Sequence, residues 1–220
     1  MTDRVDFTPE ALGGRRFYRL LTAVVVPRPI AWVSTVSADG ADNLAPHSFF
    51  TVACVNPPVI QFTSVGRKDS LTNVEQTGEF VVCLTPEALF ERINATGTEF
   101  PHGTSEFDQA GLSREPSATV RPPRVAQSPV ALECRLAATT SFGDSTVVFG
   151  RVLHAAVSRS VLRDGSPAVD LLRPLARLGA DEWSTIGAVR SIARISAEDW
   201  AAGPPAELDG ARREHPAGDS

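Results

Sequence analysis

Short β-strand patterns separated by turn residues fill residues 31–73, and they constrain the fold more than any other feature of the chain. The run AWVSTV at residues 31–36 alternates apolar and polar side chains, which is typical of a half-buried strand. An Asp-Gly pair then offers a tight hairpin turn, and further strand patterns occupy residues 49–53 and 59–63. An Asn-Pro-Pro break separates these two, because proline cannot donate to a β-ladder. The stretch predicts short antiparallel strands.

The third strand pattern leads into a basic, hydroxyl-rich loop. Residues 66–70 read GRKDS, and apolar side chains at Leu71 and Val74 then begin a helical spacing. The N-terminus of a helix binds anions through its backbone N–H groups and its dipole. We therefore expect a helix that starts near Ser70 and a loop suited to a phosphate group.

The rest of the chain is also rich in β patterns, with helices at its margins. Helices are predicted at residues 9–13, 86–95 and 171–178, and strands at 24–26, 79–84, 130–140 and 146–157. Residues 97–124 are polar and irregular except for a helical turn at 105–111, and a segment of this length is usually functional or a partner contact. The Gly-, Pro- and charge-rich residues 201–220 are predicted to be a disordered tail.

Composition excludes several classes of protein. A net charge of −5 argues against a general nucleic-acid binder, and no apolar run is long enough to span a membrane. Cys54, Cys83 and Cys134 have no metal-ligand spacing, so no metal site is expected. An odd number of cysteines without an apolar leader suggests a reducing cytoplasm. Rossmann, nucleophile-elbow and zinc-protease motifs are absent from the sequence.

Four segments together carry a family resemblance. PIAWVST at residues 29–35, NLAPHSFF at 43–50, NPP at 56–58 and RKDSLTN at 67–73 occur in this order. The chain here resembles the flavin reductase-like, FMN-binding split-barrel proteins, which include flavoredoxin-like carriers. The resemblance is densest over residues 18–84 and extends more loosely to about Trp183.

The resemblance implies a mainly β, antiparallel, Greek-key-like split barrel with a few peripheral α-helices, forming one domain over residues 1–200. It further implies an oxidoreductase in which NAD(P)H delivers hydride to FMN, in a homodimer that passes electrons to a flavin-dependent monooxygenase or another acceptor. Two alternatives stay open: an FMN-containing electron carrier and a flavin-binding module without nicotinamide turnover.

The basic loop supplies the candidates for phosphate binding, which are Arg67, Lys68, Ser70 and Thr72. Charge-assisted hydrogen bonds to phosphate are strong, and Lys68 is the only lysine of the chain. The carboxylate of Asp69 would repel a phosphate, so we expect it to cap the helix and point away. The alternative is a solvated basic turn without a ligand.

The candidates for the flavin ring lie on the first two strands and on the segment after them. They are Ser34, Thr35, Asn43, Leu44, Ala45, Pro46, His47, Ser48 and Phe50. Ser34 and Thr35 alternate along a strand, so only one can face a given side. Pro46 lacks an N–H, and we expect it to interrupt a strand and leave neighbouring amides facing the ligand. The alternatives are that Ser34 and Thr35 are ordinary strand residues, that His47 is a surface histidine and that Phe50 packs in the core.

Two later residues are candidates through the resemblance alone. His154 follows a Gly-x-Val-x-His pattern that the family places near the nicotinamide, and a hydrogen-bonded barrel histidine is the alternative. Trp183 follows a loop similar to the family's late loop, although this chain has Gly179-Ala180 where relatives often have two glycines. It would cover the flavin face or pack in the core.

Overall fold

The computed structural model describes residues 3–101 and 103–198. The chain divides into two units, Met1–Thr185 and Ile186–Ser220. The helices and strands named below lie in the first unit, and residues 186–196 of the second form neither. Within the described residues, no helix has both the length and the apolar character needed to cross a membrane.

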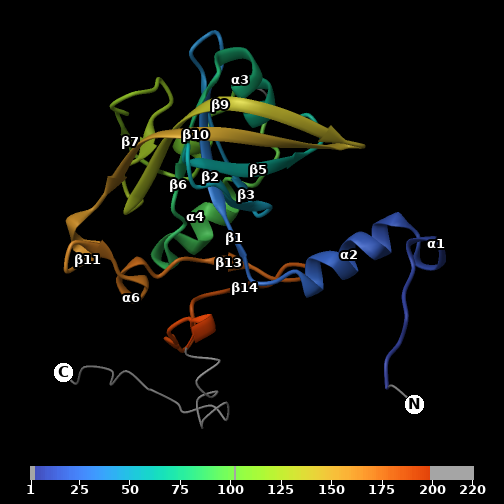
Figure 1. Ribbon diagram of the computed structural model, residues 1–220. Helices are drawn as coiled ribbons and strands as arrows, with labels where there is room; N and C mark the ends of the chain where they lie inside the picture. Colours follow the sequence, from blue (N-terminus) through green and yellow to red (C-terminus); the bar gives the residue numbers. More distant parts are fainter. Residues whose placement is uncertain (1–2, 102, 199–220) are drawn as a thin grey trace. The chain divides into compact units, whose positions relative to one another are not determined.

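The main sheet is antiparallel and has seven strands in the order β3-β2-β6-β9-β10-β5-β4 (Figure 1). These strands are β2 (Ala31–Val36), β3 (Asp42–His47), β4 (Phe50–Cys54), β5 (Val59–Val65), β6 (Glu79–Cys83), β9 (Val130–Phe142) and β10 (Ser145–Val157). β9 and β10 form the long central hairpin, with Gly143 turning at a φ of 59°.

The connection from β3 to β4 closes this sheet into a barrel. The two strands stand at opposite edges of the sheet, yet only Ser48 and Phe49 separate them in the chain. The sheet must therefore curl until its edges meet. At the junction the Thr63 N–H donates to the Phe49 carbonyl at 2.9 Å, and the His47 ring lies 4.8 Å from that of Phe62. The predicted antiparallel barrel is confirmed.

Two hydrophobic clusters cover opposite faces of β2 and β6. Because side chains alternate along a strand, Ala31 and Val33 enter one cluster while Trp32 enters the other. The barrel interior also holds Phe80, whose ring would lie 2.1 Å from a Cβ at position 150, so only Gly150 fits there. Burial on both faces makes these strands the rigid centre of the unit.

Short helices surround the barrel, as predicted, and Figure 1 shows α2 leading toward it from the N-terminus. The helices are α1 (Pro9–Leu12), α2 (Gly14–Val24), α3 (Asp69–Thr77), α4 (Phe90–Ala95), α5 (Glu106–Gln109) and α6 (Val169–Leu172), with 3-10 turns η1 (Glu87–Leu89) and η2 (Arg159–Val161). The helix predicted over 86–95 is thus split between η1 and α4.

Three small sheets complete the first unit. β1 (Arg28–Pro29) pairs with β13 (Ala176–Arg177), which pairs with β14 (Trp183–Ser184). β7 (Arg114–Glu115) pairs with β8 (Arg124–Val125) within the largely irregular 97–124 segment, and β11 (Leu162–Arg163) pairs with β12 (Ser166–Pro167).

Two sequence predictions were wrong. The strand expected at 24–26 is replaced by the end of α2, because apolar side chains at helical spacing, including Phe17, Leu21 and Val24, favour a helix over the local β-branched propensity. The helix expected over 171–178 ends at Leu172. Arg173 adopts a left-handed conformation with a φ of 42°, and the proline that follows cannot continue a helix.

The boundaries of the second strand were also wrong. The Asp-Gly turn leads directly into β3, which the sequence reading missed, and β4 begins at Phe50. The tail predicted at 201–220 lies outside the described residues.

Candidate functional site

The basic loop ends at the N-terminus of α3, as expected. Gly66 turns the chain with a φ of 75°, and Lys68 is the N-cap without a side-chain capping bond. Asp69 is therefore the first helical residue rather than the cap. The Thr72 N–H donates to the Lys68 carbonyl at 3.0 Å, so the helical ladder begins only there. The first turn ahead of it suits an anion.

Both cations of this loop have carboxylate partners that an anion can replace. Arg67 lies 2.7 Å from Glu75, and the Arg67 side chain is 65% exposed. Lys68 lies 3.7 Å from Glu99, and the Lys68 side chain is 53% exposed. Exposed ion pairs typically contribute at most about 1 kcal/mol. A phosphate bound at the helix terminus would exchange for these contacts at little cost.

β3 forms the second wall of the site and is an edge strand. The Leu44 N–H donates to Glu106 Oε2 at 2.8 Å, so it points away from β2. N–H directions alternate along a strand, and the nitrogen of Pro46 therefore also points outward. Pro46 costs no ladder bond at such a position. The expected interruption at Pro46 does not occur, and the neighbouring Leu44 amide faces Glu106.

Two side-chain hydrogen bonds fix α3 against the first hairpin. Asn43 Nδ2 donates to Ser70 Oγ at 3.0 Å, which joins β3 to the first turn of the helix. Asn73 Nδ2 donates to Thr35 Oγ1 at 3.1 Å, which joins the next turn to β2. All four side chains are buried, so the helix terminus is held in one position relative to the β3 wall.

His47 closes the inner end of this wall as a neutral imidazole. Burial lowers its pKa to about 4, the nearby charge of Lys68 acts in the same direction, and a hydrogen bond to the Thr63 carbonyl opposes them only in part. Its Nε2 atom is buried without a hydrogen-bond partner. Buried polar atoms in native proteins usually have partners. The Nε2 atom of His47 is therefore available to hydrogen-bond with a ligand beside it.

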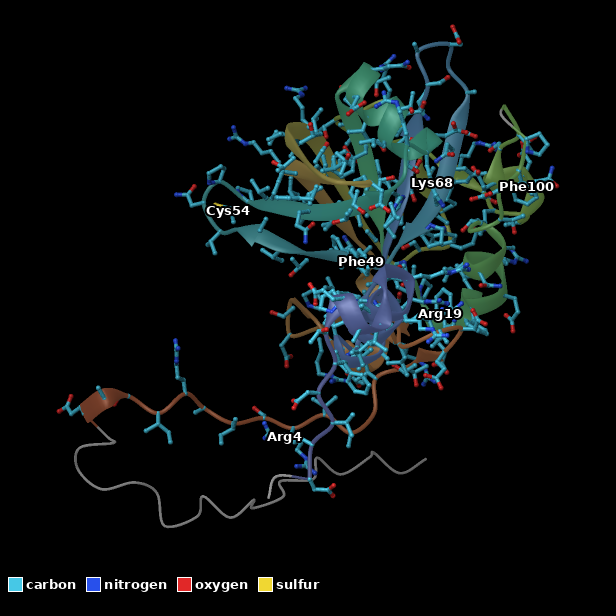
Figure 2. The ribbon with its side chains drawn as sticks, turned by 90° about the vertical axis from the view of Figure 1, so that its right-hand side faces the viewer. Arg4, Arg19, Phe49, Cys54, Lys68 and Phe100 are labelled. Atoms are coloured by element: carbon cyan, nitrogen blue, oxygen red, sulfur yellow. The ribbon has the colours of Figure 1, made fainter. Side chains whose placement is uncertain are left out.

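Residues 96–100 form the third wall, at the C-terminal end of α4. Trp32 Nε1 donates to Thr96 Oγ1 at 2.9 Å, which anchors the start of this segment to the core. Figure 2 labels Phe100, Lys68 and Phe49, which lie on three separate segments of the chain. Tyr18 of α2 meets Phe49 edge to face, with 6.3 Å between ring centroids.

These walls enclose a cavity of about 430 Å³. It is lined by Tyr18, Asn43, Ala45, Pro46, His47, Ser48, Phe49, Thr63, Val65, Arg67, Lys68, Asp69, Ser70, Thr96, Gly97, Thr98, Glu99, Phe100 and Glu106. The cavity thus combines cations and a helix N-terminus at one place with a polar strand edge and aromatic side chains at others.

Comparison with known proteins identifies the family. A family model described as the flavin reductase like domain matches residues 23–175. The chain belongs to this family. An uncharacterized protein of Aquifex aeolicus is 39% identical over 181 residues, which cover 80% of this chain and 92% of that protein.

Solved structures agree with the family. Nitrilotriacetate monooxygenase component B from Bacillus cereus superimposes with a TM-score of 0.82 at 28% identity, covering 87% of this chain and all (100%) of that chain. A 2-nitrobenzoate 2-nitroreductase from Pseudomonas fluorescens gives a TM-score of 0.78 at 28% identity, covering 94% and 100%. The architecture is the split β-barrel of flavin reductase-like proteins.

The cavity of this flavin reductase-like protein fits a flavin. A phosphate would be bound by Lys68 and the first turn of α3, where charge and dipole favour an anion. A ring system would lie against the β3 edge and the aromatic side chains, and the orphaned Nε2 of His47 lies beside that wall. A small number of polar groups in a largely preformed cavity is typical of cofactor sites.

The structure brings together eight of the residues predicted for cofactor binding. Asn43, Ala45, Pro46, His47, Ser48, Arg67, Lys68 and Ser70 all line the cavity. They come from β3, from the β3–β4 connection and from the loop and first turn of α3. Their shared location follows from barrel closure, which brings the β3 edge beside the end of β5.

Five other candidates lie behind the cavity wall. Ser34 and Thr35 are fully buried within β2; the Ser34 hydroxyl has no hydrogen-bond partner. Leu44 belongs to a core cluster, and Phe50 packs beside the other. Thr72 lies one turn into α3 and outside the lining.

Trp183 and His154 lie away from this cavity. Trp183 lines a separate cavity of about 610 Å³ and stands edge to face with Phe90, 5.3 Å between centroids, under the Arg177 guanidinium. His154 is on β10, opposite Glu133 in the ladder.

Several cavity residues were missed from the sequence, namely Tyr18, Phe49, Thr63, Val65 and the whole 96–100 wall with Glu106. The only available signal was the unusual length of the irregular 97–124 segment. The structure places Phe49 at the cavity instead of the predicted Phe50. Among the described residues no three His, Cys, Asp or Glu side chains form a group that could hold a metal ion.

Proposed function

We propose that the protein binds FMN in this cavity and acts as an NAD(P)H-dependent flavin reductase. The observation that carries the proposal is the joining of a basic helix N-terminus to a polar strand edge in one cavity. Family membership supports a flavin ligand. The terminal phosphate of FMN suits the α3 site, and this favours FMN over riboflavin.

The redox chemistry belongs to the bound flavin, which accepts hydride from a nicotinamide and passes electrons onward. The protein's residues bind and orient it. Lys68 and the first turn of α3 hold the phosphate, and neutral His47 offers a hydrogen-bonding group without a charge. Phe49 and Tyr18, which pack edge to face, place aromatic surface along one side of the cavity. Proposed contact of His154 with the nicotinamide rests on the family resemblance.

We propose further that the protein works as a homodimer and supplies electrons to a separate acceptor such as a monooxygenase. The exposed apolar face of α2 supports a second copy, because no residue of this helix is buried in one chain and Leu21 and Val24 are 46% and 63% exposed. One structural relative is a component of nitrilotriacetate monooxygenase. Light scattering tests the dimer; a monomer that still binds FMN would contradict it.

Stopped-flow mixing of the FMN-loaded protein with NADH or NADPH tests the reductase. Rapid bleaching of the flavin absorption is expected with at least one of them. An FMN-loaded protein inert to both would instead be an electron carrier or a flavin-binding module. A His154→Ala variant should raise the KM for the nicotinamide without changing FMN affinity.

A further inference from the structure

Glu106 is a buried carboxylate inside the proposed flavin cavity. It is the first residue of α5, is only 8% exposed, and lines the cavity together with Lys68 and Ser70. Its Oε2 atom accepts the Leu44 N–H at 2.8 Å. No lysine or arginine of the described residues forms an ion pair with it.

The charged groups that surround Glu106 are mostly negative. Asp42 on β3 and Asp69 at the start of α3 both act on it electrostatically. Asp42 is itself paired with Arg114 and accepts a hydrogen bond from Ser105. Two cations of the described residues line the same cavity, and each has another carboxylate partner: Lys68 pairs with Glu99 and Arg67 with Glu75. Within the part of the chain that the structure describes, Glu106 is thus a buried carboxylate without a lysine or arginine partner, and two further carboxylates act on it.

Its protonation is consequently biased toward the neutral form. Burial raises the pKa of Glu106, hydrogen bonds from Leu44 and from its own backbone oppose this, and Asp69 and Asp42 raise the pKa further. A phosphate at the α3 terminus would add negative charge to the same cavity. Like charges brought together in a poorly solvated site disfavour ionisation.

We propose that Glu106 couples phosphate binding to proton uptake: when a phosphomonoester binds at the N-terminus of α3, the carboxylate of Glu106 takes a proton from solvent. This rests on the proposed function, because it requires the phosphate of FMN to occupy that terminus. The O–H bond forms on Glu106, and the proton comes from water or buffer acid. The cavity thereby avoids holding an ionised Glu106 beside the negative phosphate, and FMN affinity falls as pH rises through the interval in which only the complex holds the proton.

Isothermal titration calorimetry in buffers of different ionisation enthalpy counts the protons taken up. The probes are FMN and riboflavin, and the proteins are the full-length wild type, Glu106→Gln and Glu91→Gln. Glutamine keeps an oxygen for the Leu44 N–H. Glu91 is an exposed carboxylate of α4 outside the cavity lining, so its variant controls for the change in net charge.

Wild type and Glu91→Gln should take up a measurable fraction of a proton with FMN and none with riboflavin, and Glu106→Gln should lose the uptake that FMN adds. FMN binding without proton uptake, or with equal uptake in Glu106→Gln, overturns this inference and leaves the proposed function standing. Absence of FMN binding overturns both. The number of protons taken up by the wild type can contradict the proposal by itself. The proposal therefore stays testable even if the Glu106→Gln chain fails to fold.

Discussion

Trp32 Nε1 donates a hydrogen bond to Thr96 Oγ1 at 2.9 Å, and both residues are buried. The Thr96 hydroxyl in turn donates to the Ile93 carbonyl at 2.8 Å. Trp32 lies in the most buried strand of the barrel, whereas Thr96 lines the cavity. The core therefore fixes the point from which the 96–100 wall leaves α4.

Replacing Thr96 by valine should destabilise the protein. The indole N–H would be buried without a partner, and such a loss costs roughly 1–3 kcal/mol. Urea denaturation measures the free energy of unfolding. Thr98→Val is the matched control, because Thr98 is exposed, and it should change the free energy little. Equal losses in both variants would contradict the role given to the Trp32 bond.

Lys68→Ala should weaken FMN binding and leave the fold intact. A charge-assisted hydrogen bond contributes roughly 1.5–3 kcal/mol, which corresponds to about tenfold or more in affinity. Arg67 can compensate in part through its longer fork, so changing both residues should cost more. Flavin fluorescence quenching measures the affinity, with circular dichroism to check the fold.

Riboflavin lacks the phosphate, and its affinity should hardly respond to Lys68→Ala. Arg159→Ala removes an exposed cation outside the cavity lining and controls for net charge. If FMN and riboflavin lose affinity equally, Lys68 acts on the structure and the phosphate lies elsewhere.

Arg124 should be important for folding because it pairs with a fully buried carboxylate. Glu133 is 0% exposed and lies 2.5 Å from Arg124. Burial alone would raise the pKa of Glu133, yet hydrogen bonds from Thr119, Ala118 and Arg124 lower it to about 2. Arg124→Met would leave this charge unpaired and should cost roughly 3–5 kcal/mol in the free energy of unfolding. Arg121→Met is the control, because the ion pair of Arg121 with Glu79 is more exposed. If Arg124→Met lowers the free energy of unfolding no more than this control does, the role given to Arg124 is wrong.

His47 should make stability depend on pH. Its pKa falls from 6.5 to about 4 in the folded chain, so between these values only the unfolded chain binds the proton. The contribution of His47 to the free energy of unfolding is fully present above pH 6.5. It is lost as the pH falls toward 4, by roughly 3 kcal/mol in total. His47→Phe keeps an aromatic ring against Phe62 and should remove this component. Denaturation at pH 7.5 and 4.5 measures it; identical pH dependence in both proteins would show that His47 is not the source.

The sequence was most informative where local pattern and tertiary environment agree. The alternation at residues 31–36 predicted β2 with its observed bounds, and the glycine-marked turn predicted the β9–β10 hairpin. The loop before α3 could be predicted because a basic, hydroxyl-rich turn that precedes a helical spacing places positive charge at a helix N-terminus. These features depend on neighbours within a few residues.

Strand order was not determined locally. The first three strand patterns of the sequence were expected to lie together, but β2 and β5 are separated in the sheet by β6, β9 and β10. Pairing between strands so far apart in the chain is determined by burial of both faces of the sheet and by barrel closure. Neither can be recognised from a few neighbouring residues of the sequence. The prediction at Pro46 was wrong for the same reason, since only the sheet order shows that β3 is an edge.

By itself, the sequence determined the β-rich class, the family resemblance and the basic phosphate-binding candidates, because each is written in adjacent residues. Only the tertiary structure decided that Phe49 rather than Phe50 lines the cavity, that Thr35 stands behind it, and that Glu106 enters it from 62 positions beyond its Leu44 partner. The physical reason is that a cavity is the space left after closure and packing are complete. Its lining depends on which edges meet, and that is settled by the whole chain together.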